Sequence, residues 1–496
     1  MSDSTSDASP AEPIVGRSAI IGVGFILVAV TAVIWKSSLD GTFQFDDFTN
    51  ILNRSVDDSV PIFTDHLSSN RPVGTYSLAL NWYYCGESPR GYHLFNLAIH
   101  LANVVLVYTG VLLSRITWLR SRGVEAKISS FWLLSATITA LFWGIHPLNT
   151  QAVTYIVQRF ESLAALGYLG AWVGLLIVTS TTKLGTRIAG GAMLIVFAWL
   201  GMLSKEIFAT APLTIFLFDR LVTADSFRNV LRRRWLVYAG MLTPFVWFVP
   251  SVTRWLSPAS ESSSMGFGMK QISSWEYLRT QPEVILHYLR LSFWPHPQSI
   301  DYAWRVQQNP TIYLSLGAII VAVIATAACL YYRGLSGPVS NRSEADSTGH
   351  GNGESEPEVE QEQNQRSRWI RQAAGFFGWG TLAFFFILAP TSSLVPIADL
   401  AFEHRMYLPL TLVVCGGVFA SAFVIRRLWQ TSNNRVVLAA GISLLTLAIG
   451  GTLGWRTHVR NLDYRSHLTL WKSVVEVSPE NPRGWYNLGR AYGDYD

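Results

Sequence analysis

Charged residues are scarce in this chain. Only 14% of its 496 residues are Asp, Glu, Lys or Arg, whereas soluble domains carry about 25%. Half of the residues are hydrophobic. This composition is typical of a protein that crosses a bilayer many times, because each charge at the bilayer centre costs about 3 kcal/mol or more. We therefore interpret the net charge of +5 as loop topology and expect no nucleic-acid partner.

Cysteine is also scarce, with only Cys85, Cys329 and Cys415. The last two lie in apolar runs and Cys85 then lacks a partner, so we predict no structural disulfide. This favours a bacterial inner membrane over the endoplasmic reticulum. No dense cluster of Asp and His has the spacing of a metal site. We predict neither a metal ion nor a cofactor.

Long apolar runs dominate what is present. The first seventeen residues lack the basic start and cleavage site of a signal peptide, so the first run is expected to be a retained anchor. Eleven runs approach the roughly 20 residues that a spanning helix needs, and the predicted fold class is an all-α polytopic membrane protein. The runs are 18–35, 92–114, 130–147, 160–180, 188–204, 207–223, 236–255, 311–332, 373–389, 406–425 and 436–455.

Lys and Arg residues are concentrated in every second loop between the predicted spans. With a cytoplasmic tail at 1–17, the basic loops lie inside, and the odd number of spans puts the C-terminal end outside. One inside loop, 334–368, is rich in Gly, Ser, Glu and Gln, and we predict that it is disordered. Two outside loops, 36–91 and 256–310, are long. In the second, Tyr277 to Trp294 has helical periodicity and is expected to lie in the outer interface, bordering a groove for a lipid tail.

The tail at 456–496 reads as a different domain from the spans of 18–455. Residues Trp485 to Tyr492 match the W-x2-L-G-x2-Y signature of a tetratricopeptide repeat at every defined position. One such repeat cannot bury its own apolar face. We therefore expect the tail to be the truncated start of a repeat array on the outer side.

Polar residues gather at the outer ends of the spans. Charges that border spans are costly and are therefore functional candidates. They are Asp46, Asp47, Arg71, His146, Arg159, Glu161, Lys205, Glu206, Glu403, His404 and Arg405.

Each candidate also has a purely structural interpretation. Asp46 and Asp47 suit a helix N-terminus, and His146 before Pro147 suits a helix end. Lys205-Glu206 suits a polar turn, and Arg405 suits a side chain that reaches up to the interface. Arg159 and Glu161 suit a local pair. Their common placement on the outer side favours a single functional site.

The chain resembles a known family at an ordered set of short motifs. The family is the transmembrane and tetratricopeptide-containing O-mannosyltransferases with their bacterial relatives, which have the C-type membrane glycosyltransferase architecture. At residue 161 this chain has Glu where relatives usually have Asp. The motifs are Phe45-Asp46-Asp47, Arg71-Pro72, Tyr92-His93-Leu94-Phe95-Asn96, His146-Pro147, Gln151-Ala152-Val153, Arg159, Leu203-Ser204-Lys205-Glu206, Tyr288-Leu289, Trp294-Pro295 and Glu403-His404-Arg405-Met406-Tyr407-Leu408-Pro409.

The resemblance implies specific roles. Asp46 would be the catalytic base, and Asp47 would position it or bind the acceptor. Lys205 and Arg405, joined by Arg159, would bind the donor phosphate. The supporting residues would be Arg71, His146, Glu206, Glu403 and His404.

The chemistry of these residue types agrees with those roles. A Ser or Thr hydroxyl needs a positioned base, which a carboxylate supplies. A departing lipid phosphate needs cations, and Arg binds phosphate in a bidentate manner. The predicted function is inverting transfer of a mannose-like sugar from polyprenyl phosphate to a protein hydroxyl on the outer side, with the repeats recruiting the acceptor. Alternatives are transfer to a lipid or glycan, a transporter or flippase, and a membrane-tethered repeat scaffold.

Overall fold

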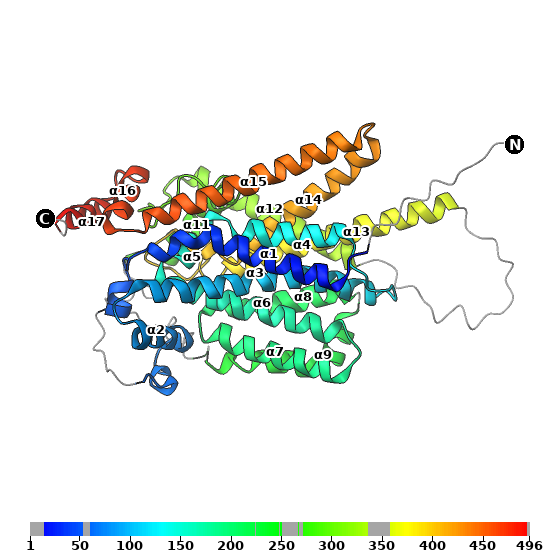
Figure 1. Ribbon diagram of the computed structural model, residues 1–496, viewed down its shortest axis with the longest axis horizontal. Helices are drawn as coiled ribbons and strands as arrows, with labels where there is room; N and C mark the ends of the chain where they lie inside the picture. Colours follow the sequence, from blue (N-terminus) through cyan, green and yellow to red (C-terminus); the bar gives the residue numbers. More distant parts are fainter. Residues whose placement is uncertain are drawn as a thin grey trace.

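The protein is a bundle of long helices (Figure 1). The computed structural model describes residues 14–52, 60–223, 225–247, 249, 266, 271–335 and 358–493. Among these, the only β-type pairing is an isolated bridge between Ile14 and Ser129. The α-helices are α1 (Arg17–Ile34), α2 (Pro72–Cys85), α3 (Pro89–Arg120), α4 (Ser130–Gly144), α5 (Thr150–Val153), α6 (Arg159–Thr179), α7 (Leu184–Met202), α8 (Ala211–Thr223), α9 (Phe227–Leu242), α11 (Ser274–Phe293), α12 (Pro310–Leu335), α13 (Glu358–Leu388), α14 (Pro409–Thr431), α15 (Arg435–Asp463), α16 (His467–Val477) and α17 (Pro482–Gly493).

Short helical turns connect the long helices, and several of them carry the candidate residues. Six are 3-10 turns and one, η2, is a π-turn. They are η1 (Trp35–Asp40), η2 (Phe48–Leu52), η3 (Phe63–His66), η4 (Pro147–Asn149), η5 (Ile156–Gln158), η6 (Glu206–Thr210) and η7 (Glu403–Met406).

Seven helices in the described ranges are long and apolar enough to cross a bilayer. An eighth span is counted if α4 and the following 147–153 segment, bent by 50°, form one. The chain is therefore a multi-pass membrane protein, and these eight correspond to eight of the eleven predicted spans. The other three do not pass the same test: 207–223 holds the 13-residue α8, 236–255 is only partly described, and all but the last residue of 373–389 lies in α13.

The loop predicted to be disordered is helical at both of its ends. Helix α12 continues to Leu335, and α13 begins at Glu358, so the expectation was wrong for residues 334–335 and 358–368. Residues 336–357 lie outside the described residues, as does the predicted flexible start of the second outer loop at 257–264.

Glycines allow the central helices α6 and α7 to approach closely. A Cβ atom on Gly167 would lie 2.3 Å from the Cα atom of Gly201, and one on Gly174 would lie 2.8 Å from the carbonyl oxygen of Gly190. Small residues at such crossings let helix backbones pack directly in a membrane. This packing fixes the end of α7, where Lys205 follows.

The C-terminal tail is not a separate unit. Helices α16 and α17 lie at the same end of the bundle as α2, at the left of Figure 1. Buried side chains of α16, including Leu470 and Trp471, share one hydrophobic cluster with Phe43 and Ile51 of the first loop and with Tyr155. The tail and the first loop therefore share one hydrophobic core across the expected boundary at 455/456. Helix α15 also continues through this boundary to Asp463.

The helix expected from Tyr277 to Trp294 is confirmed as α11, Ser274–Phe293. A capping box defines its start, because the Ser273 side chain accepts the Glu276 N–H while Glu276 accepts the Ser273 N–H. Its buried face includes Tyr277, Val284 and Tyr288, spaced at helical intervals. The same face supplies partners to the candidate site.

Candidate active site

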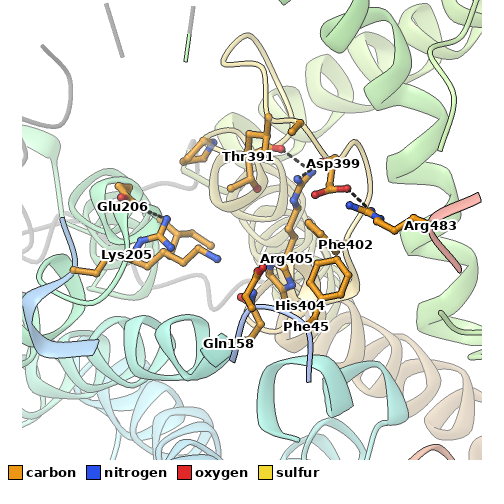
Figure 2. A pocket seen from close by; sticks show the side chains of 16 residues that line it. Phe45, Gln158, Lys205, Glu206, Thr391, Asp399, Phe402, His404, Arg405 and Arg483 are labelled. Carbon is orange, nitrogen blue, oxygen red and sulfur yellow. Dashed lines mark hydrogen bonds and ion pairs between the residues drawn. The ribbon is translucent and has the colours of Figure 1, made fainter. Parts of the chain in front are cut away.

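One pocket of about 350 Å³ brings six of the predicted residues together, namely Asp46, Arg71, Lys205, Glu206, His404 and Arg405. In Figure 2, Lys205 and Glu206 lie on one side, Asp399 and Arg483 on the other, and Arg405 and His404 between them. The remaining lining residues are Phe45, Gln158, Ile207, Pro390, Thr391, Ile397, Ala398 and Phe402. The other predicted residues do not line this pocket.

Asp46 is presented to the pocket by a strained turn. The preceding Phe45 has φ of 49°, a left-handed conformation that is uncommon for a bulky residue. The Asp46 backbone N–H donates to the Tyr155 hydroxyl at 2.9 Å. Burial raises the pKa of the Asp46 carboxyl, whereas its hydrogen bond with Tyr155 opposes the rise. A carboxylate with a raised pKa suits a proton acceptor.

Asp47 has a different environment from its neighbour. It is completely buried, and its two carboxylate oxygens accept the backbone N–H groups of Gln44 and Val157, each at 2.8 Å. Burial raises the pKa of Asp47 to about 7, against the effect of these two donors. Asp47 therefore fastens the first loop to the segment before α6, and it has no free face for an acceptor.

Arg405 brings a buried guanidinium to the pocket. Its acceptors are the Tyr277 hydroxyl and the carbonyl oxygens of Thr391, Leu400 and Asp399, at 2.7 to 3.1 Å. All four are neutral, so the positive charge is not cancelled by a carboxylate. A buried cation without an anion favours an anionic ligand.

The other pocket cations each have a carboxylate partner. Lys205 Nζ pairs with Glu161, which gives Glu161 a role that the sequence did not assign. Arg71 pairs with Glu206 at 3.0 Å. Figure 2 marks the third pair, Arg483 with Asp399, at 2.8 Å.

Charge pairing therefore singles out two lining residues. Among the described residues, neither Asp46 nor Arg405 forms an ion pair. Asp46 carries a carboxylate and Arg405 a guanidinium cation, and both line the same pocket. A general base and an anion-binding cation are the two groups that displacement of a phosphate by a hydroxyl requires.

His404 is held neutral beside the cations. Burial lowers the pKa of its imidazole, and the charges of Lys205, Arg405 and Arg71 lower it further. Its ring stacks on Phe402, with ring centroids 5.0 Å apart. The influence of three cations on one ring places His404 in a positive field, where a neutral imidazole can contact a sugar or phosphate oxygen.

Arg159, His146 and Glu403 support the fold around the pocket. Arg159 is buried and donates to Asn81 at 2.5 Å and to the Ser77 and Tyr92 carbonyls, so the structure does not bring it to the pocket with Lys205 and Arg405. His146 accepts the Leu148 N–H at 3.2 Å, which is the helix-end role. Glu403 accepts from Gln298, Ser299 and Tyr302 and fixes the 298–302 segment.

Sequence reasoning missed Asp399 and Arg483. Asp399 lies in the irregular segment between α13 and η7. Arg483 lies in the first turn of α17, in the tail that was expected to be separate. The one available signal was its position directly after Asn481-Pro482 at the start of the repeat motif.

No three of the described His, Cys, Asp and Glu residues are grouped so as to hold a metal ion. Metal independence stays a prediction, which chelation tests. The chemistry that the pocket residues themselves offer is proton acceptance by Asp46 and anion binding by Arg405.

The chain is similar in sequence to several known proteins. A protein O-mannosyl-transferase of Caenorhabditis elegans is 24% identical over 509 residues, covering 98% of this chain and 62% of the relative. The chain resembles the protein O-mannosyltransferases. Protein O-mannosyl-transferase TMTC3 of Mus musculus is 23% identical, covering 94% of this chain and 48% of its own length. This O-mannosyltransferase-like chain thus spans about half to three-fifths of these relatives.

A third relative matches a shorter part of the O-mannosyltransferase-like chain. Protein O-mannosyl-transferase TMTC1 of Homo sapiens is 30% identical over 169 residues, covering 31% of this chain and 18% of the relative. No family model matches. Among solved structures, ArnT from Cupriavidus metallidurans has a TM-score of 0.33 at 15% identity, covering 84% of this chain and 81% of its own.

Proposed function

We propose that the protein is a membrane glycosyltransferase. It moves a mannose-like sugar from a polyprenyl-phosphate donor to a Ser or Thr hydroxyl of a protein, on the extracytoplasmic face. The observation that carries the proposal is the shared pocket of Asp46, Lys205 and Arg405. Relatives that match almost the whole chain are named protein O-mannosyl-transferases, which supports the same reaction class.

The reaction is a direct displacement. Asp46 takes the proton of the acceptor hydroxyl as its oxygen attacks the anomeric carbon. The bond from that carbon to the phosphate oxygen breaks, and its electron pair leaves with the lipid phosphate. The products are the glycoside and polyprenyl phosphate, and Asp46 returns its proton to water. One displacement inverts the anomeric carbon, by analogy with inverting glycosidases.

Arg405 stabilises the departing phosphate. In the part of the chain that the structure describes, no carboxylate pairs with its guanidinium, so the developing negative charge finds a pre-positioned cation. Lys205 lines the same pocket but pairs with Glu161. Lys205 therefore contributes less net charge than Arg405, and it contacts the phosphate as a second donor.

The reaction as written uses no cofactor and no metal ion. Its negative charge develops on the phosphate, and side-chain cations receive it. Activity is accordingly expected to persist when divalent ions are chelated.

The pocket geometry favours the enzyme over a transporter. A transporter would place polar groups near the middle of the bilayer, whereas Asp46 lies in the first loop, Lys205 directly before η6 and Arg405 in η7, all in connections between the long helices. A scaffold whose only active part is the repeat array gives Asp46 and Arg405 no role. Transfer to a lipid or glycan stays an alternative acceptor class, against which the repeat signature is the argument.

The test is transfer by the purified protein from a panel of polyprenyl-phosphate sugars to Ser- and Thr-containing peptides. We expect transfer from the mannosyl donor, with and without EDTA. Release of polyprenyl phosphate without formation of glycopeptide would show that the acceptor is water or another hydroxyl and not the peptide. Absence of release from every donor would overturn the proposal.

A further inference from the structure

The two tail helices, α16 and α17, both contact Phe45, the residue that precedes Asp46. The ring of Trp471 in α16 lies 5.7 Å from the ring of Phe45, centroid to centroid. The guanidinium carbon of Arg483 in α17 lies 5.2 Å from the centroid of Phe45. Because Phe45 has a left-handed backbone, surrounding contacts must hold it there. The tail supplies two of these contacts.

Arg483 also joins two loops of the membrane domain. Its Nε donates to Asp301 at 2.6 Å and its Nη2 to Asp399 at 2.8 Å. Asp301 is only 3% exposed, and Asp399 lines the pocket. A cation in the first turn of a helix opposes the helix dipole, so Arg483 is placed against local preference. A residue placed in this way is expected at a functional site.

We infer that Arg483 is a positioning residue, through which the tail forms one wall of the active site and holds the Asp46 turn. This inference rests on the proposed function. Arg483 fixes Phe45 from one side and holds Asp399 at the pocket edge. The tail therefore does more than recruit an acceptor, because its first helices complete the site.

The charges around Asp46 give this role a specific signature. The groups that face it are Tyr155, Asp399 and Arg483, beside the buried Asp47. Across the pocket lie Arg71, Lys205, Glu206, His404 and Arg405. Asp399 raises the pKa of Asp46 and Arg483 lowers it. Without Arg483, one of the groups that offset the effect of Asp399 is lost, and the pKa of Asp46 is expected to rise.

The experiment compares Arg483→Gln and Arg483→Lys with wild type in the transfer assay across pH. We expect Arg483→Gln to move the acidic limb of kcat/KM to higher pH. At a pH below the limb, moving it by one pH unit lowers kcat/KM roughly tenfold. Arg483→Lys keeps the charge, but an ammonium group lacks the planar, forked guanidinium that bonds both Asp301 and Asp399. It is expected to lower kcat with little movement of the limb. An unmoved limb and an unchanged kcat in both variants would overturn the inference.

A matched control and a second readout keep the test decisive. Arg305→Gln breaks an exposed pair with Glu480, 2.7 Å long, between the second outer loop and the same tail, and is expected to leave transfer unchanged. Hydrogen exchange of residues 43–48 is expected to rise in Arg483→Gln and not in Arg305→Gln. If wild type transfers no sugar, the proposed function fails, whereas unchanged exchange in Arg483→Gln contradicts the positioning role alone.

Discussion

Asp47 accepts the Val157 backbone N–H at 2.8 Å, which ties the first loop to the segment that opens α6. Its second oxygen accepts the Gln44 N–H. The adjacent Asp46 carboxyl accepts no backbone N–H among the described residues; it faces the pocket and has the Tyr155 hydroxyl as its hydrogen-bond partner. Two neighbouring carboxylates thus have separate tasks, one structural and one chemical, and substitutions should separate them.

Asp47→Asn is expected to destabilise the protein. An amide has one oxygen and one NH2 group, so one of the two backbone N–H donors loses its acceptor, at a cost of about 1–3 kcal/mol. Asp46→Asn is expected to leave thermal stability near wild type, because among the described residues its carboxyl forms no ion pair and accepts no backbone N–H as Asp47 does. Thermal unfolding in detergent checks both variants. Equal melting temperatures for Asp47→Asn and wild type would contradict the fastening role.

The buried pair of Lys205 and Glu161 predicts strong coupling. Removing one partner leaves a buried charge uncompensated, which costs about 3–5 kcal/mol. Lys205→Met and Glu161→Gln are each expected to destabilise, and the double variant to be more stable than their sum predicts. A double-mutant cycle by denaturant unfolding measures this coupling. Additive effects would show that the pair is not energetically linked.

Arg405 is expected to set affinity for the donor phosphate. Arg405→Gln removes the one lining cation that has no carboxylate partner among the described residues, and loss of a comparable anion-stabilising donor lowers kcat by about 100-fold or more. Arg405→Lys keeps the charge and is expected to lose less. Donor titrations measure KM and kcat for both, with the exposed Arg290→Gln as a control outside the pocket. A donor KM and kcat equal to wild type in Arg405→Gln would refute the phosphate contact.

The pH dependence follows from Asp46. The ionised carboxylate is the active base, so transfer is present above its pKa and is lost as pH falls through it. Burial raises this pKa, and the limb is expected above the ordinary Asp value of about 3.9. Tyr155→Phe removes a hydrogen bond that lowers this pKa, so it should move the limb to higher pH. A limb that stays in place in this variant would argue against Asp46 as the titrating base.

The sequence predicted most of the elements that cross the membrane. Long apolar runs have a clear length signal, and eight of the eleven expected spans are present as helices or as one bent pair. Two further runs are not separate long helices: 207–223 is divided between the turn η6 and the 13-residue α8, and most of 373–389 falls in the longer α13. Their lengths depend on packing against neighbours, which periodicity does not report.

Site residues were predicted best where a charge borders an apolar span. Asp46, Lys205 and Arg405 met that condition and meet in the pocket. Arg159 also borders an apolar span, yet its guanidinium donates hydrogen bonds to Asn81 and to backbone carbonyls instead of lining the pocket. Arg483 escaped notice because its contacts join segments about 80 and 180 residues apart. Such pairings appear only in the folded chain.

The most direct test of the account compares Asp46→Asn with Asp65→Asn, an exposed carboxylate outside the pocket in the same loop. Both keep side-chain size while removing one charge. Purified variants would be assayed for mannose transfer from polyprenyl phosphate to a Ser/Thr peptide. We predict a loss of at least ~100-fold for Asp46→Asn, the range for a general base, and near wild-type transfer for Asp65→Asn. Full transfer by Asp46→Asn would contradict the assignment of the base and the mechanism built on it.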